Sequence, residues 1–121
     1  MKLPANEDQL LLLHNPRCSK SRRVKVLLED RGVAFTERRY LDDPLDREEL
    51  VELGRRLARP AHEWTRSQEA AFSEAGLSEA SSEERVLEAM EVHPILMERP
   101  ILVRGHQARI GRPPEEILSI L

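Results

Sequence analysis

Four consecutive leucines, Leu10–Leu13, followed by an Asn15–Pro16 turn, restrict the fold of this chain more than any other feature. A short apolar run that ends at a turn signal is typical of a buried β-strand. The next segment, Ser19–Arg31, has apolar residues at helical spacing and is followed by Gly32, so we expect an amphipathic helix there. Val33–Arg39 then has the pattern of a second strand. A strand, a helix and a strand in this order predict a parallel βαβ unit with a right-handed crossover.

The middle of the chain, at about residues 46–93, has the pattern of three helices. Past Pro60, the second of these helices is expected to carry Trp64, Arg66 and Phe72. A Ser or Asp that is followed three positions later by Glu is typical of a capping box at a helix start. This pattern marks the start of the first and of the third helix, at Asp46 with Glu49 and at Ser81 with Glu84.

The last part of the chain predicts two strands and a short helix. Ile101–Val103 and Ala108–Ile110 flank a Gly105–His106 turn and predict a β-hairpin. Pro113 fits the first position of a final helix. The whole order is that of a thioredoxin-like architecture with a four-stranded sheet and a helical insertion, at about 46–93, between its two halves. The periodicity by itself predicts only an α/β or α+β fold with a mixed sheet.

Length and composition exclude several classes of protein. A chain of 121 residues is long enough for one core, so we expect a single domain over residues 1–121. A net charge of −3 and a pI of about 5.8 give no general affinity for nucleic acid. No apolar run approaches the ~20 residues of a membrane span, and the polar first nine residues do not resemble a signal peptide. We therefore expect a monomer that binds neither nucleic acid nor membrane.

Cysteine and histidine usage narrows the chemistry further. The single cysteine leaves no internal disulfide and suits the reducing cytoplasm, where we expect this protein. Four scattered histidines without ligand spacing argue against a metal site. Charged residues make up 34% of the chain, and its paired arginines are therefore expected on solvated faces: Arg22–Arg23, Arg38–Arg39 and Arg55–Arg56.

That single cysteine, Cys18, precedes the first turn of the first expected helix. Unpaired backbone N–H groups and the positive end of the helix dipole favour thiolate there, so its pKa should fall below the usual value of about 8.5. Arg17 and Lys20 add positive charge. A lone cysteine is often an inert core residue, but a polar, basic loop favours a reactive thiol. Ser21 fills the second position of a Cys-x-x-Cys pair, so the chain has no resolving thiol.

Three segments carry a family resemblance as a set: "LLLHNPRCSKSR", "HPILMERPILV" and "ARIGRPPEEIL". Together they resemble the ArsC-type, glutaredoxin-coupled arsenate reductase family, and most closely its shorter, ArsC-like subgroup. The similarity extends in order from about Leu10 to Leu121. The resemblance implies a thioredoxin-like fold and an arsenate reductase in which Cys18 forms a covalent adduct with arsenate or a related oxyanion.

The resemblance also implies which residues form the site. Three arginines hold the oxyanion in that family, and the matching positions are Arg66, Arg99 and Arg112. The family has a cis peptide bond at the position of Arg99–Pro100. The family's histidine before Asn-Pro matches His14, whose alternative role is a hydrogen bond to the loop backbone. We expect the Ser21 hydroxyl to donate to the thiolate and to cap the helix. The supporting residues are therefore expected to be His14, Asn15, Arg17, Ser19, Ser21 and Pro100.

Arsenate gains two electrons when it becomes arsenite, and one thiol cannot supply them by closing a disulfide within the chain. The resemblance implies glutathione and then glutaredoxin as the external source, with no bound cofactor and no metal. Two alternatives stay open. One is a monothiol redox protein that acts on glutathionylated substrates. The other is a Spx-like regulator that binds RNA polymerase, although such regulators use a Cys-x-x-Cys switch that Ser21 removes.

Overall fold

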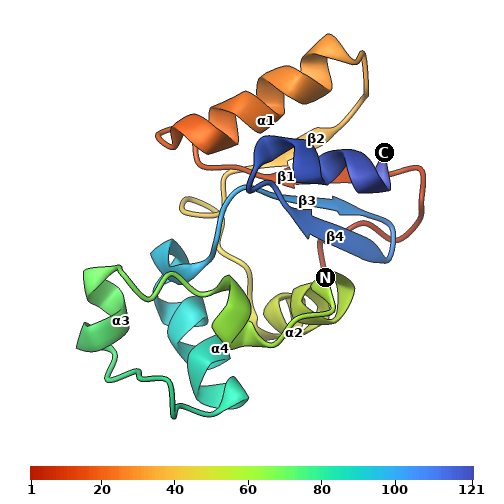
Figure 1. The fold of residues 1–121 in the computed structure, drawn as a ribbon. Coiled ribbons are helices and arrows are strands. Elements are labelled where there is room, and N and C mark those ends of the chain that lie inside the picture. The colour runs from red at the N-terminus through yellow and green to blue at the C-terminus, as the bar shows by residue number, and fades with distance from the viewer.

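The computed structural model describes all 121 residues and contains one four-stranded sheet with the order β2-β1-β3-β4 (Figure 1). Strand β2 runs parallel to β1, whereas β3 is antiparallel to both β1 and β4. This mixed sheet with its βαβ unit confirms the expected thioredoxin-like fold. The strands are β1 (Leu10–Leu13), β2 (Thr36–Arg38), β3 (Ile101–Arg104) and β4 (Gln107–Ile110).

Helices cover both faces of the sheet (Figure 1). Helix α1 and the C-terminal 3-10 helix η3 lie over one face, and α2 and α4 lie beneath the other, with α3 farther out. None of these helices is long and apolar enough to cross a lipid bilayer. Their bounds are α1 (Ser19–Asp30), α2 (Arg47–Leu57), α3 (Ala70–Glu74), α4 (Glu83–Val92) and η3 (Pro114–Ile120), with two shorter 3-10 helices η1 (Ala61–Trp64) and η2 (Pro94–Leu96).

The position of β1 between the two layers explains its unbroken run of leucines. Successive side chains of a strand point to opposite faces of the sheet. Leu10 and Leu12 accordingly pack into the core under α1 and η3, whereas Leu11 and Leu13 pack into the larger core above α2 and α4. All four side chains are buried. A strand buried on both faces has no position for a polar residue, so β1 ends where the polar loop begins.

The helix that was expected to carry Trp64, Arg66 and Phe72 is not continuous, so that prediction is wrong. The chain forms η1 and α3 with an extended link between them. In that link Thr65 forms an antiparallel bridge with Met97, and the Arg66 N–H donates to the Leu96 carbonyl at 2.7 Å. Pairing with a distant segment therefore replaces the local helical hydrogen bonds. Arg66 consequently lies on an extended segment beside the chain that leads to Arg99.

Strand β2 covers only Thr36–Arg38 of the expected Val33–Arg39, and two helix starts also differ from the sequence predictions. Helix α4 is capped by Ser82, whose hydroxyl accepts from the Arg85 N–H at 3.1 Å, whereas the Ser81 hydroxyl accepts from the Ser78 N–H. The last helix is of the 3-10 type and begins one residue later than expected, with Pro113 at its N-cap. Both are differences of one residue at helix ends, where several nearby hydroxyls or prolines satisfy the same pattern.

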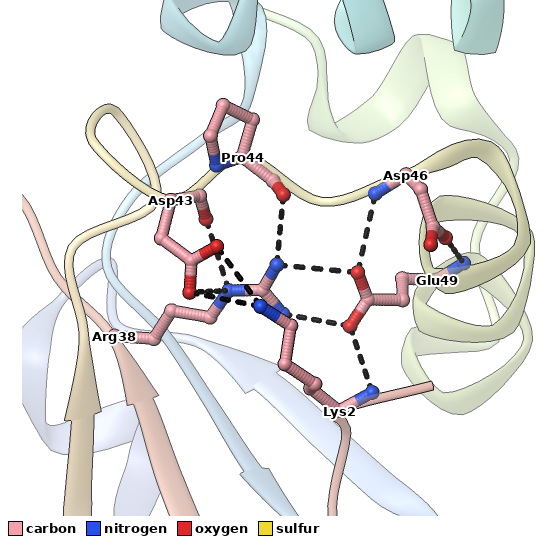
Figure 2. Close-up of polar contacts among 6 residues, drawn as sticks. All are labelled: Lys2, Arg38, Asp43, Pro44, Asp46 and Glu49. Carbon is pink, nitrogen blue, oxygen red and sulfur yellow. Dashed lines mark hydrogen bonds and ion pairs between the residues drawn. The ribbon is translucent and has the colours of Figure 1, made fainter.

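A buried ion pair joins β2 to α2 (Figure 2). Nη1 of Arg38 lies 2.7 Å from Oε2 of Glu49, and Nη2 donates to the Pro44 carbonyl at 2.8 Å. The backbone N–H of Lys2 donates to the same carboxylate at 3.1 Å. Glu49 also completes the capping box with Asp46 that the sequence predicts. The pair therefore fixes the start of α2 and the N-terminal segment against the edge of the sheet.

The prediction of solvated faces is wrong for Arg38 and for Arg56, which are both buried. Nη1 of Arg56 donates to the carbonyls of Pro4 and Gly105 at 2.8 Å each, and Nε donates to Glu52. A guanidinium can be buried when acceptors match its donors. Besides Glu52 on the same helix, the acceptors of Arg56 are backbone carbonyls from distant loops, which local charge patterning does not reveal.

Candidate functional site

The loop between β1 and α1 places Cys18 at the N-cap of α1. Asn15 shapes this loop, because its Oδ1 accepts from the Arg17 N–H and its carbonyl accepts from the Cys18 N–H, both at 3.0 Å. Arg22 braces the loop by donating from Nη1 to the Pro16 carbonyl at 2.9 Å. The Cys18 side chain is half-buried and its thiol is free. The loop thus presents the sulfur at the start of the helix.

The surroundings of Cys18 favour its thiolate. Burial by itself would raise the pKa of the thiol. The backbone N–H groups of Ser21 and Lys20 and the positive charge of the Arg99 guanidinium oppose this. The balance lowers the pKa of Cys18 below its ordinary value. A thiolate next to converging N–H donors is suited to attack on an oxyanion.

His14 and Ser21 form a buried pair behind the cysteine. The Ser21 hydroxyl accepts from the Asn15 N–H at 3.0 Å and lies 3.0 Å from Nδ1 of His14. Burial lowers the pKa of His14, and it outweighs the nearby carboxylate of Glu37, so the neutral imidazole is favoured. These are the two hydrogen-bond contacts of the hydroxyl, and neither joins it to the backbone of α1. The expected donation from the Ser21 hydroxyl to the thiolate is therefore not observed, because this hydroxyl faces His14 and Asn15.

Arg99 and Arg112 are held together by backbone contacts. Nε of Arg112 donates to the Arg99 carbonyl at 2.8 Å, and the same Nε lies 3.1 Å from Oε1 of Glu98. The Arg99–Pro100 peptide bond is cis, as the family resemblance implies. Gly111 packs so closely that an added Cβ would lie 2.9 Å from Cγ of Pro100. This close approach brings the segment of Arg112 beside Arg99.

Arg66 is held by its own neighbours on the extended link. Its Nη2 lies 2.5 Å from Oε1 of Glu69, and its Nη1 donates to the Ile95 carbonyl at 3.4 Å. The remaining expected residues differ in exposure: Arg17 and Ser19 are exposed at the rim of the loop, and Pro100 is buried. No group of three or more His, Cys, Asp or Glu side chains gathers as a metal site would require.

Comparison with known proteins identifies the family of this chain. The family model of the ArsC family matches residues 13–120. The chain belongs to the ArsC family. It is 38% identical over 115 residues to the arsenate reductase of Neisseria meningitidis serogroup A, covering 93% of this chain and 98% of that protein. The uncharacterized protein YfgD of Escherichia coli is 44% identical over 115 residues, covering 93% and 97% of the two chains.

A solved structure of a family relative agrees with the fold. The arsenate reductase from Vibrio cholerae superposes with a TM-score of 0.89 at 39% identity, covering 98% of this chain and 100% of that chain. The longer arsenate reductase of Escherichia coli is 34% identical over 115 residues, covering 94% of this chain and 82% of that protein. Membership of the ArsC family therefore extends over nearly the whole chain, including the cysteine loop and the "ERPI" and "GRPP" segments.

Tyr40 lies close to the ArsC-family cysteine and was missed in the sequence analysis. Its side chain is fully buried, and its hydroxyl has no hydrogen-bond partner. Burial raises the pKa of Tyr40 to about 12, against the opposing charges of Arg99 and Arg66, and Cys18 raises it further. The hydroxyl therefore interacts electrostatically with all three side chains. Its position just after β2, at the edge where the cysteine loop begins, is the signal that could have identified it.

A second donor in this family site also lacks an acceptor. Nε of Arg99 is buried and has no hydrogen-bond partner. Buried donors without partners are rare and costly, so each calls for an explanation. Here the guanidinium of Arg99 and the hydroxyl of Tyr40, which carry these unpaired donors, both interact electrostatically with Cys18. The arrangement can therefore accept a ligand rich in oxygen acceptors beside a thiolate.

Proposed function

We propose that this chain is an arsenate reductase in which Cys18 is the nucleophile. The observation that carries the proposal is the position of Cys18 at the N-cap of α1, where the N–H groups of Lys20 and Ser21 and the charge of Arg99 lower the pKa of the thiol. The names of the relatives from Neisseria meningitidis and Vibrio cholerae support arsenate as the substrate. The unpaired donors of Arg99 and Tyr40 support an anionic, oxygen-rich ligand.

In the first step the thiolate attacks arsenic. A sulfur–arsenic bond forms, and one arsenate oxygen leaves as water after taking up protons. Thiolate and arsenate repel each other, and positive charge from Arg66, Arg99 and Arg112 offsets that repulsion. Arginine suits this task because its planar fork donates two parallel hydrogen bonds and keeps its charge.

The reduction itself draws on thiols from outside the chain. Two external thiol groups lose two electrons and two protons and form one disulfide, while the arsenic bound to Cys18 goes from arsenic(V) to arsenic(III). Water then cleaves the sulfur–arsenic bond, which releases arsenite and returns the Cys18 thiol. We propose glutathione and then glutaredoxin as these thiols. The chain has no second cysteine, and the Ser21 side chain is engaged with Asn15 and His14, which supports an external resolving thiol.

An assay coupled to NADPH tests the proposal. Purified protein is supplied with glutathione, glutaredoxin, glutathione reductase and NADPH, with and without arsenate. We expect NADPH oxidation that depends on arsenate and is lost in Cys18→Ser. A half-buried single thiol also suits exchange with glutathione adducts. If arsenate has no effect while a glutathione mixed disulfide is turned over, the chain is a monothiol exchange protein and the proposal is wrong.

A further inference from the structure

The carboxylate of Glu98 lies between two of the candidate oxyanion arginines. Its Oε1 is 3.1 Å from Nε of Arg112 and 3.5 Å from Nη1 of Arg99. The same oxygen accepts from the backbone N–H of Arg99 at 3.3 Å. Three nitrogen atoms of two arginines therefore lie within 3.5 Å of one carboxylate oxygen. An oxygen of a bound oxyanion would need the same kind of donors.

The backbone of Glu98 is fixed, whereas its carboxylate has room to move. The Glu98 N–H donates to the Trp64 carbonyl at 2.9 Å, next to the bridge between Thr65 and Met97. Its side chain is 24% exposed and borders a cavity of about 530 Å³, which Arg112 also lines. A rotation about the side-chain bonds therefore lets the carboxylate leave Arg99 without moving the main chain.

Carboxylates pair with all three arginines. Arg66 pairs with Glu69, and Glu98 pairs with both Arg99 and Arg112. Positive charge at the site is thus partly compensated before any ligand enters. An incoming anion competes for these arginines with carboxylates that already interact with them, and a carboxylate that stays nearby repels the anion.

We propose that Glu98 is an internal competitor of the oxyanion, which holds Arg99 and Arg112 until an anion displaces it and thereby sets the affinity of the site. This inference rests on the oxyanion-binding part of the proposed function. Glu98 acts through the arginines, so it is a positioning residue. The rival role, in which its carboxylate aligns the arginines for the anion, predicts the opposite change when the charge is removed.

Sulfate binding to Glu98→Gln distinguishes the two roles. Glutamine keeps the size of the side chain and removes its charge. We expect isothermal titration calorimetry at constant ionic strength to give a Kd for sulfate about tenfold lower than that of the wild type. The matched control is Glu88→Gln, which changes the net charge equally but breaks an exposed pair with Arg85 on α4, and its Kd should equal the wild-type value.

A gain of affinity cannot arise from misfolding, so a lower Kd confined to Glu98→Gln supports the proposal. An equal or higher Kd in Glu98→Gln overturns it, as does the absence of sulfate binding in all three proteins. Sulfate binding is measured without turnover, so the inference and the proposed function fail separately. Tighter sulfate binding in a protein that leaves arsenate unreduced would refute the reductase and keep the role of Glu98. Arsenate reduction with unchanged sulfate binding would refute only the role of Glu98.

Discussion

Nε of Arg112 donates a hydrogen bond to the backbone carbonyl of Arg99 at 2.8 Å. This bond orients the guanidinium of Arg112 against the segment that also carries Glu98. The two Nη groups of Arg112 make no hydrogen bond within the protein, so they are available to a ligand. One contact therefore fixes the orientation of the side chain while the rest of the fork stays open.

Arg112→Lys should weaken arsenate binding more than it weakens the fold. Lysine keeps the positive charge, but it has no planar fork with which to donate to the Arg99 carbonyl and to an oxyanion at the same time. We expect steady-state kinetics to give a KM for arsenate about tenfold higher, with little change in Tm because the side chain is 28% exposed. Arg109→Lys, on β4, is the matched control and should leave KM unchanged. An Arg112→Lys enzyme with the wild-type KM would contradict this role.

The pKa of Cys18 should be lower in the native protein than in the unfolded chain. The N–H groups of Ser21 and Lys20 and the charge of Arg99 outweigh the effect of burial only in the folded state. The rate of alkylation by iodoacetamide, followed against pH, should therefore have a lower midpoint in buffer than in urea. Arg99→Gln should move the native midpoint upward. Equal midpoints in buffer and urea would show that the fold does not activate this thiol.

Tyr40→Phe should reduce activity without loss of stability. The Tyr40 hydroxyl is buried without a partner, so its removal relieves an unsatisfied group. A pKa of about 12 keeps this hydroxyl protonated, and it can donate to an oxyanion. We expect kcat/KM for arsenate to fall about tenfold while Tm stays equal or rises. Unchanged kcat/KM would exclude Tyr40 from the site, and a large drop in Tm would indicate a structural role.

The buried pair of Arg38 and Glu49 should make the fold sensitive to acid. Glu49 is buried, which would raise its pKa, but hydrogen bonds from Arg38, Asp46 and Lys2 lower the pKa to about 2, from an ordinary value of 4.5. A carboxyl with a depressed folded-state pKa stabilises the fold above pH 4.5 and loses that contribution as the pH falls toward 2. The contribution at neutral pH is on the order of 3 kcal/mol.

Urea unfolding between pH 7 and pH 2 measures this dependence. Wild-type stability should decline below pH 4.5, and Glu49→Gln should be less stable at pH 7 with a flatter profile in that window. Glu88→Gln, which breaks an exposed pair, is the control and should follow the wild type. A Glu49→Gln profile parallel to the wild-type profile would show that the pair does not carry the acid sensitivity.

The local patterns at both ends of the chain predict the fold well. The boundaries of β1 are as expected, α1 ends one residue earlier than expected, and the hairpin of β3 and β4 turns at Gly105–His106. These elements are specified by neighbouring residues: an apolar run, helical spacing, and a turn glycine with positive φ. The helix expected at Arg66 fails because its hydrogen bonds go to Leu96, which is distant in sequence.

The same distinction between local sequence patterns and contacts with distant residues holds for the candidate site. Its cysteine and arginines carry motifs that a sequence reveals, and the structure gives their contacts. Glu98 and Tyr40 carry no motif of their own, and their importance lies in contacts with Arg99, Arg112 and the cysteine loop. The buried Arg38 shows the converse, since its charge pattern resembles that of a surface residue while its partners are the Asp43–Pro44 loop and Glu49 of α2. Sequence reasoning finds the reactive groups, and only the fold shows what holds them.

The most direct test of the account is the arsenite formed from arsenate by the purified protein with glutathione and glutaredoxin. Separation of the two arsenic species by chromatography with elemental detection measures it without a coupled enzyme. We predict that the wild type forms many molecules of arsenite per molecule of protein. With Cys18→Ser, arsenite should stay at the level measured without protein. Arsenite formation at the same rate in Cys18→Ser, or none above that background in the wild type, would contradict the role of Cys18.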